Sequence, residues 1–170
     1  MASRNYTVDD FNHLLVERMP GAEHSFEAAN YMDIGENAAV TEPFALEYLQ
    51  SMSLALLLSS CLQLTIGEPI ILLHNLGSYE GRCNGMRMRV LGIWRNCMEV
   101  AIMDKRFDGK VCLLSRIKLT TCEEELLFLL QHTQFPICLC SAMTVNKSQD
   151  QPLEHVGIYL YTLAYTHGQL

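Results

Sequence analysis

The apolar positions near the start of the chain repeat with the spacing of a helix. The segment "TVDDFNHLLVERMPG", residues 7–21, carries one such stripe on an otherwise polar background. The stripe consists of Val8, Phe11, Leu14, Leu15 and Met19. Thr7 has the position of an N-cap, with Asp10 three residues later, and Pro20-Gly21 ends the pattern. The pattern therefore predicts an amphipathic helix that stops before Pro20.

Two weaker patterns follow. "HSFEAANYM", residues 24–32, predicts a short strand. "TEPFALEYLQSM", residues 41–52, predicts a second short helix, because a threonine cap is followed by an early proline.

From residue 62 the chain becomes rich in aliphatic and β-branched residues. "LQLTIGEPIILLHNL", residues 62–76, predicts two short strands with a kink at Gly67 and Pro69. Asn84-Gly85 is a strong turn signal, and Met86, Met88 and Val90 alternate after it. "CMEVAIM" and "VCLLSRIKL" predict a hairpin that bends at Asp108-Gly109. Several short strands with turns about every ten residues predict a small β-barrel.

The last third of the chain mixes helical and extended signals. Thr121 and Glu124 have capping-box spacing, and "EEELLFLLQ" is rich in helix formers. "FPICLCSAM", residues 135–143, predicts a buried strand that begins at Pro136. A polar loop, a possible helix in "SQDQPLEH" and a strand in "VGIYLY" follow, which is the order of a βαβ unit in a parallel sheet. Ligands bind at the carboxyl ends of such strands, where residues 144–149 would lie.

Composition sets the broad class of the protein. Hydrophobic residues make up 49% of the 170 residues and charged residues 18%, as in a globular protein. No apolar run is long enough to span a bilayer, and the first residues lack the apolar core of a signal peptide, so we expect an intracellular protein that does not bind membranes. The seven cysteines include no CxxC pair. This pattern favours buried thiols over disulfides or a zinc site.

The charge distribution is uneven. A formal net charge of -7 argues against a strong general nucleic-acid binder. Nine of the twelve Lys and Arg residues nevertheless lie between residues 80 and 120. A solvated hairpin surface would explain this cluster equally well.

Three blocks of the chain resemble one family of enzymes. "FPICLCSAMTVNKSQDQPLEHVGIYL" resembles helicase motif V of the petite-integration-frequency (Pif-type) DNA helicases and of their relatives in Helitron transposons. "LTIGEPIILLHNLGSYEGRCNGMRMRV" and "ASRNYTVDDFNHLLVERMPG" resemble two further blocks of this family. The terminal "THGQL" resembles the stretch before motif VI, so the resemblance covers nearly the whole chain.

The resemblance implies an ATP-dependent helicase of superfamily 1B that moves 5′ to 3′ on single-stranded DNA. The implied fold class is α/β: a partial RecA-like domain 2A with an inserted small SH3-like β-barrel, domain 2B. The implied boundaries are residues 1–61 and 126–170 for domain 2A and residues 62–125 for domain 2B. The family also implies that "LLFLLQHTQF" is extended, and we prefer this to the helix predicted from its composition.

The resemblance also implies roles for individual residues. In motif V, Thr144, Asn146 and Ser148 would donate hydrogen bonds to DNA phosphates, and Lys147 would supply a positive charge. Asn84 and Arg87 would also contact DNA. Gln149 and Gln151 would sense the nucleotide. The competing interpretation is an exposed loop without a ligand.

The chain departs from the family pattern at several positions. Asp150 replaces a glycine and Pro152 replaces a threonine, which adds a negative charge and removes a backbone N–H near the expected phosphates. His74 and the pair His132-Thr133 replace basic residues, and we expect each change to reduce the positive charge on the DNA side.

Two hypotheses follow. The sequence contains no GxxxxGK[ST] motif and no acidic pair after a strand, and motif VI would start beyond Leu170. The first hypothesis is therefore a helicase fragment, the second motor domain, inactive alone and dependent on a first motor domain in trans. ATP and magnesium belong to the intact family and are not expected for this chain alone. The alternative is a non-catalytic SH3-like module that binds protein or nucleic acid. The family further implies nuclear localisation and roles in DNA repair, recombination and telomere maintenance.

Overall fold

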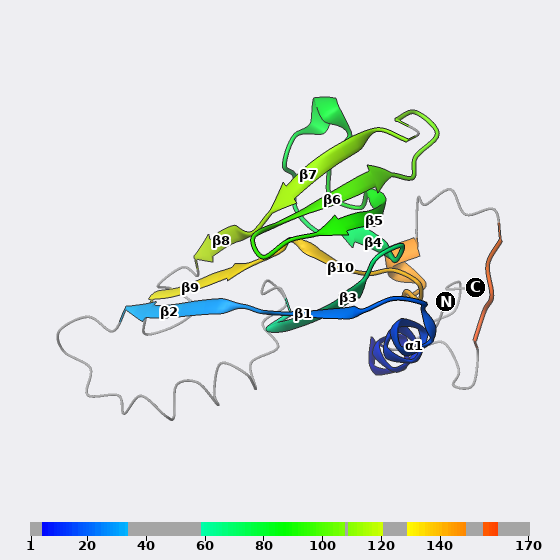
Figure 1. Cartoon of the computed structure of the whole chain (residues 1–170), viewed down its shortest axis with the longest axis horizontal. Helices are drawn as coiled ribbons and strands as arrows, with labels where there is room; N and C mark the ends of the chain where they lie inside the picture. Colours follow the sequence, from blue (N-terminus) through cyan, green and yellow to red (C-terminus); the bar gives the residue numbers. More distant parts are fainter. Residues whose placement is uncertain (1–4, 34–58, 108, 121–128, 149–154, 160–170) are drawn as a thin grey trace.

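A computed structural model describes residues 5–33, 59–107, 109–120, 129–148 and 155–159. Its described part contains one α-helix and three antiparallel sheets (Figure 1). The elements in chain order are α1 (Asn5–Arg18), β1 (Glu23–Glu27), β2 (Ala29–Asp33), β3 (Cys61–Thr65), β4 (Pro69–Leu72), the 3-10 turn η1 (Ser78–Glu80), β5 (Arg87–Ile93), β6 (Cys97–Ile102), β7 (Val111–Ser115), β8 (Ile117–Thr120), β9 (Leu129–Gln134), β10 (Ile137–Leu139) and the 3-10 turn η2 (Asn146–Ser148).

The helix forms as predicted, but its start and its buried face differ from the prediction. α1 begins at Asn5, so Thr7 lies inside the helix and is not its N-cap. The buried positions are Val8, Asn12 and Val16, four residues apart, whereas Leu14 and Leu15 are 48% and 39% exposed. The predicted stripe was wrong at these two leucines, because packing against β3 and the segment around Ala142 selects the neighbouring stripe.

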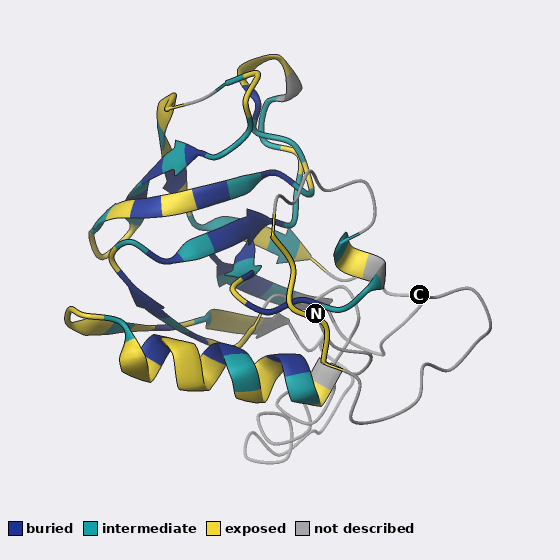
Figure 2. Ribbon diagram, turned by 90° about the vertical axis from the view of Figure 1, so that its right-hand side faces the viewer, coloured by how far each residue is buried: buried dark blue, intermediate teal, exposed yellow. Residues whose placement is uncertain are grey.

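The core lies on one face of a five-stranded sheet with the order β10-β4-β5-β6-β7. Met86, Met88 and Val90 are buried, which confirms the alternation predicted after Asn84-Gly85. Gly85 has a φ of 86°, the left-handed conformation that this turn requires. The predicted strands of residues 62–76 and the hairpin of β6 and β7 are also present, and their inward side chains join the same core. Figure 2 marks the buried positions along the ribbon in dark blue.

The remaining strands form two small sheets, with the orders β1-β3 and β2-β9-β8. The strand predicted at residues 24–32 is divided between β1 and β2, which belong to different sheets. β9 confirms the extended form expected for residues 129–134. The helix predicted at residues 41–52 and the capping box at residues 121–124 lie outside the described residues.

Two expectations about topology concern the direction of the strands and the closure of the sheet. Every pairing among the described strands is antiparallel, including that of β10 with β4. The helix of the predicted βαβ unit and the end of its second strand lie outside the described residues, and Tyr159 of that strand carries a single β-bridge. Among the described strands the five-stranded sheet ends at β10 and β7, so these strands close no barrel. A strand has the same sequence pattern whether its neighbour is parallel or antiparallel. The partner of β10 therefore depends on which strand edge is available, and here it is that of β4.

A cation–aromatic contact joins the sheets. The Arg116 guanidinium lies over the rings of Phe26 and Phe135, 5.7 and 5.3 Å from their centroids, and its Nη1 donates to the carbonyl of Glu27 at 2.8 Å. The two phenylalanine rings meet edge to face at 5.2 Å. The Gln134 side chain also donates to the carbonyl of Phe26, at 2.8 Å. β1 is therefore attached to the residues that flank β8 and β9.

Candidate nucleic-acid interface

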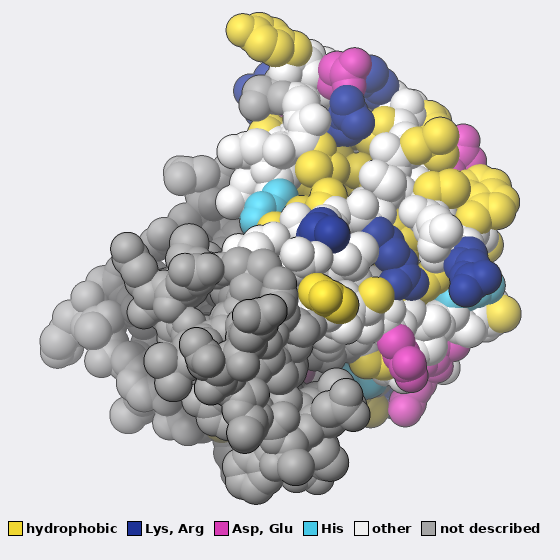
Figure 3. Space-filling model, turned by 90° about the vertical axis from the view of Figure 1, so that its left-hand side faces the viewer, with side chains coloured by type: hydrophobic (Ala, Val, Ile, Leu, Met, Phe, Trp, Pro, Cys, Tyr) yellow, Lys and Arg dark blue, Asp and Glu magenta, His cyan; other side chains and the backbone are white. Residues whose placement is uncertain are grey.

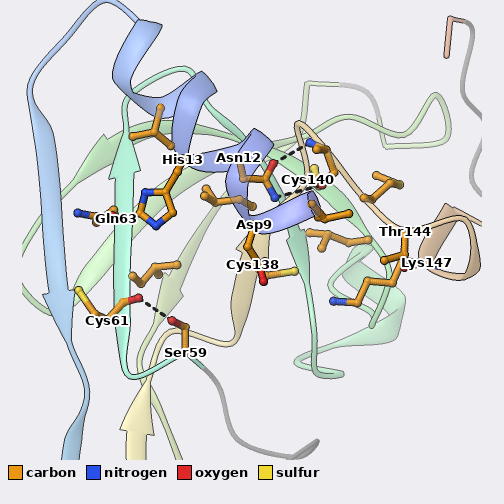
Figure 4. A pocket seen from close by; sticks show the side chains of 17 residues that line it. Asp9, Asn12, His13, Ser59, Cys61, Gln63, Cys138, Cys140, Thr144 and Lys147 are labelled. Carbon is orange, nitrogen blue, oxygen red and sulfur yellow. Dashed lines mark hydrogen bonds between the residues drawn. The ribbon is translucent and has the colours of Figure 1, made fainter. Parts of the chain in front are cut away.

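A cleft of about 450 Å³ lies between α1, β3 and the segment of residues 138–147 (Figure 4). Its wall is partly apolar and includes Val8, Val16, Leu62, Ile71 and Leu139. Polar side chains from all three elements also line it, namely Asp9, Asn12, His13, Gln63, Thr144 and Lys147. The cleft therefore brings residues of the motif V block next to the first helix of the chain.

Asn12 attaches α1 to the segment that precedes the polar loop. The backbone N–H of Ala142 donates to Asn12 Oδ1 at 2.7 Å, and Asn12 Nδ2 donates to the carbonyl of Ala142 at 3.2 Å. Asn12 is only 6% exposed, so both hydrogen bonds form away from water. This residue was missed by the sequence analysis. An available signal was a carboxamide midway between Val8 and Val16, on a face that is otherwise apolar.

The polar loop itself closes into the turn η2. The backbone N–H of Lys147 donates to Thr144 Oγ1 at 3.4 Å, and that of Ser148 donates to the Thr144 carbonyl at 3.2 Å. The Ser148 hydroxyl donates to the Val145 carbonyl at 2.6 Å. Ser148 therefore uses its hydroxyl proton inside the turn, whereas Thr144 accepts there and keeps its proton for another acceptor.

Lys147 supplies the positive charge of the cleft. Its side chain is exposed, and Figure 4 shows its amino group pointing into the cleft, toward Cys138. Burial raises the pKa of the Cys138 thiol, Lys147 lowers it and Asp9 raises it. Both charged groups thus act on the same thiol. A phosphate in this cleft would be attracted by Lys147 and repelled by Asp9.

Arg87 occupies a different environment. It lines a second cavity of about 420 Å³, together with Phe11, Cys140, Met143 and Tyr159. Cys140 and Met143 also line the first cleft, so the segment around them separates the two cavities. Burial raises the pKa of Cys140 to about 11, and a hydrogen bond from Arg87 partly opposes this effect.

The structure brings together only part of the predicted site. Thr144, Lys147 and Ser148 lie on one turn, with the backbone of Asn146 between them. Asn84 is exposed in the turn before β5, where its backbone N–H donates to Asn75 Oδ1 at 2.8 Å. Gln149 and Gln151 lie outside the described residues.

The replacement of a basic residue at His132 lies at a buried position. His132 is 2% exposed, and its Nδ1 lies 2.6 Å from Asn30 Oδ1. It lies opposite Asn30 in the three-stranded sheet, so its side chain is not on the surface of the described structure.

The described ranges contain no group of three or more His, Cys, Asp and Glu side chains able to hold a metal ion. They also contain no helix with the length and hydrophobicity needed to cross a membrane.

Known proteins resemble this chain in sequence and in fold. Residues 47–93 match the family model described as "DNA helicase Pif1, 2B domain". The fold is similar to that of the Pif1 helicase from Candida albicans, with 18% identity and a TM-score of 0.69 over 92% of this chain and 37% of that chain. It is also similar to a Bacteroides Pif1 helicase in complex with ADP-AlF3 and ssDNA, with 18% identity and a TM-score of 0.60 over 88% of this chain and 31% of that chain.

An unliganded Pif1 from Bacteroides sp. gives 19% identity and a TM-score of 0.59 over 88% of this chain and 42% of that chain. The chain thus spans less than half the length of these solved helicases. Among curated proteins, none matches the chain.

Proposed function

We propose that this chain, a Pif1-type helicase fragment by its 2B sequence and its fold, is the second motor region of a superfamily 1B DNA helicase that moves 5′ to 3′. Its part in that reaction is to hold single-stranded DNA. The observation that carries the proposal is the turn η2, which presents Lys147 at a cleft and is attached to α1 through Asn12.

The chemistry of the turn suits reversible binding of DNA phosphates. Lys147 is a point charge for one phosphate, and the Thr144 hydroxyl is a neutral donor beside it. Neutral donors add little to the total attraction, so a small displacement of the turn would be enough to exchange one phosphate for the next. Gln149 and Gln151 follow the turn in sequence and would transmit the nucleotide state to it.

The proposal assigns ATP hydrolysis to a first motor domain. The sequence contains no GxxxxGK[ST] segment to hold the β and γ phosphates and magnesium. The residues present therefore do not fit ATP and magnesium. We expect this chain to show no ATPase activity by itself and to need a first motor domain in trans. Nuclear localisation is part of the same proposal.

The test is binding of a fluorescein-labelled oligothymidylate to the full chain, followed by fluorescence anisotropy at several salt concentrations. We expect saturable binding whose affinity falls linearly with salt on a double logarithmic plot, because phosphate contacts release counterions. Binding that does not depend on salt, or that does not saturate below about 1 mM, would rule out a DNA role.

A further inference from the structure

Strand β7 is an edge of the five-stranded sheet. Among the described strands it pairs only with β6. The N–H of Ile102 donates to the Lys110 carbonyl at 3.0 Å, which fixes the alternation of the ladder. From this alternation, Cys112 and Leu114 exchange their backbone hydrogen bonds with β6. The backbone groups of Val111, Leu113 and Ser115 face the open edge.

This edge lacks the features that usually protect exposed strands. Its sequence, "VCLLS", contains no charged residue and no proline. The register shift in the sheet lies in β5, not in β7. Val111 and Leu113 are 48% and 61% exposed. An open, uncharged edge with exposed aliphatic side chains is a template for another strand.

The outer face of the sheet continues this surface. The register places Ala101 beside Val111 and Glu99 beside Leu113. Leu91 and Trp94, which are 40% and 52% exposed, lie within and just after β5. Figure 3, seen from the side toward which β7 and β8 point, shows exposed hydrophobic side chains among Lys and Arg side chains.

The charged side chains around β7 determine which kind of strand can pair with its open edge. If β7 paired antiparallel with a second copy of itself about Leu113, Lys110 would lie opposite Arg116, and like charges in that position are destabilising. Lys118, two residues after Arg116, is an exposed cation. Glu99 is the only carboxylate of β5, β6 and β7. The surroundings therefore favour an incoming strand with carboxylates at its ends.

We propose that the edge of β7 binds an extended segment of a partner protein that is apolar or β-branched in its middle and acidic at both ends. The backbone groups of Val111, Leu113 and Ser115 would pair with the segment, and the side chains of Val111 and Leu113 would contact its apolar positions. Lys110 and Lys118 would attract its carboxylates. This binding is independent of the DNA grip at Lys147.

The probe is a labelled synthetic peptide with the sequence Glu-Glu-Thr-Val-Thr-Val-Glu-Glu, and the control peptide has lysine in place of each glutamate. We expect the full chain to bind the acidic peptide at least about tenfold more tightly than the basic one. Hydrogen exchange should slow at the amides of Val111, Leu113 and Ser115 when the acidic peptide binds. Equal affinity for both peptides, or unchanged exchange at these amides, would overturn the proposal.

Leu113→Pro removes one backbone N–H that faces the edge and none that pairs with β6. We expect it to weaken binding about tenfold, whereas Leu113→Thr, which keeps the N–H, should stay within about threefold. If Leu113→Pro fails to fold, Leu113→Glu and Leu113→Lys form a second pair, of which only the glutamate variant should lose the acidic peptide. Equal binding by the proline and threonine variants, or by the charged pair, contradicts the proposal. The proposal is also contradicted if sedimentation measurements detect a dimer of the unbound chain and Leu113→Lys abolishes that dimer. Such a result would show that the edge of β7 binds a second copy of the chain.

Discussion

Asn12 and Ala142 lie 130 residues apart in the sequence and are joined by two hydrogen bonds, one in each direction. The carboxamide of Asn12 acts like a short piece of strand backbone, because it satisfies both the N–H and the carbonyl of Ala142. The turn that carries Thr144 and Lys147 begins two residues later. The position of the proposed DNA contact therefore depends on a residue of the first helix.

The Asn12 pair makes a prediction about stability and binding together. Asn12→Ala should lower the free energy of unfolding by roughly 2 to 4 kcal/mol, because two buried backbone groups lose their partners. Asn12→Asp keeps the acceptor for the Ala142 N–H but places a buried carboxylate oxygen against the Ala142 carbonyl, so we expect at least as large a loss of stability at neutral pH. At a urea concentration where both variants are folded, DNA affinity should still be reduced for Asn12→Ala. If the two variants unfold at the same urea concentration as the wild type, Asn12 does not hold the segment.

Substitutions at Lys147 and Asp150 should change DNA affinity in opposite directions. Lys147→Ala should weaken oligothymidylate binding and reduce the salt slope by about 0.7, the value for one phosphate contact with a single strand. Asp150→Gly should strengthen binding, because it removes a charge that repels phosphate. The control is Lys118→Ala, an exposed lysine on β8 in a different sheet, which should leave the slope unchanged. A slope that responds to Lys118 and not to Lys147 would assign DNA binding to another surface.

Arg116 should contribute to stability through its shape as well as its charge. It stacks over Phe26 and Phe135 and donates to the Glu27 carbonyl. Arg116→Lys keeps the charge but loses the planar stacking group, so we expect a loss of about 1 kcal/mol in urea unfolding. The same replacement at the exposed Arg95 is the control and should change stability by less than about 0.5 kcal/mol. An equal effect at both positions would show that stacking of Arg116 on the two rings does not contribute to stability.

Glu68 should make stability depend on pH. It is fully buried, its Oε2 accepts the backbone N–H of Thr65 at 3.2 Å, and its Oε1 has no hydrogen-bond partner. Burial raises the pKa of this carboxyl above its usual value, and the Thr65 hydrogen bond partly opposes the effect. Between the unfolded and the folded pKa, the folded state therefore keeps a proton that the unfolded state has lost. The contribution of this carboxyl to the free energy of unfolding is complete below the unfolded pKa and is lost as pH rises through the folded pKa.

Glu68→Gln stays neutral and should remove this decline. Urea unfolding between about pH 4 and about pH 8 measures it for the wild type and the variant. The exposed Glu23, replaced in the same way, should leave the wild-type profile unchanged. The assignment fails if the profile of Glu68→Gln declines as steeply as that of the wild type.

Cys140 and Cys61 should differ in reactivity. The pKa of Cys140 is raised to about 11 by burial, so at pH 8 only about one molecule in a thousand carries the thiolate that reacts. Cys61 is exposed and lies 3.3 Å from the Ser25 hydroxyl. Iodoacetamide labelling followed by mass spectrometry should modify Cys61 well before Cys140, and the difference should disappear in urea. Faster labelling of Cys140 in the folded chain would show that the segment around it opens readily.

Local patterns predicted the central strands correctly. Asn84-Gly85 and the alternation of Met86, Met88 and Val90 define a turn and the inner face of β5, because both depend only on backbone conformation and side-chain period. The motif V block likewise predicted a polar loop where the structure has the turn of Thr144 and Lys147. The sequence alone also shows that no GxxxxGK[ST] segment occurs among these 170 residues.

Tertiary structure decided the features that need a distant partner. Val16 is buried and Leu14 is exposed because β3 and the Ala142 segment contact one side of α1, and no local pattern contains that choice. β10 pairs antiparallel with β4, although its sequence would suit either direction. Burial and hydrogen bonding between residues far apart in the chain are properties of the assembled fold, so the sequence determined the elements and the structure determined which of their surfaces meet.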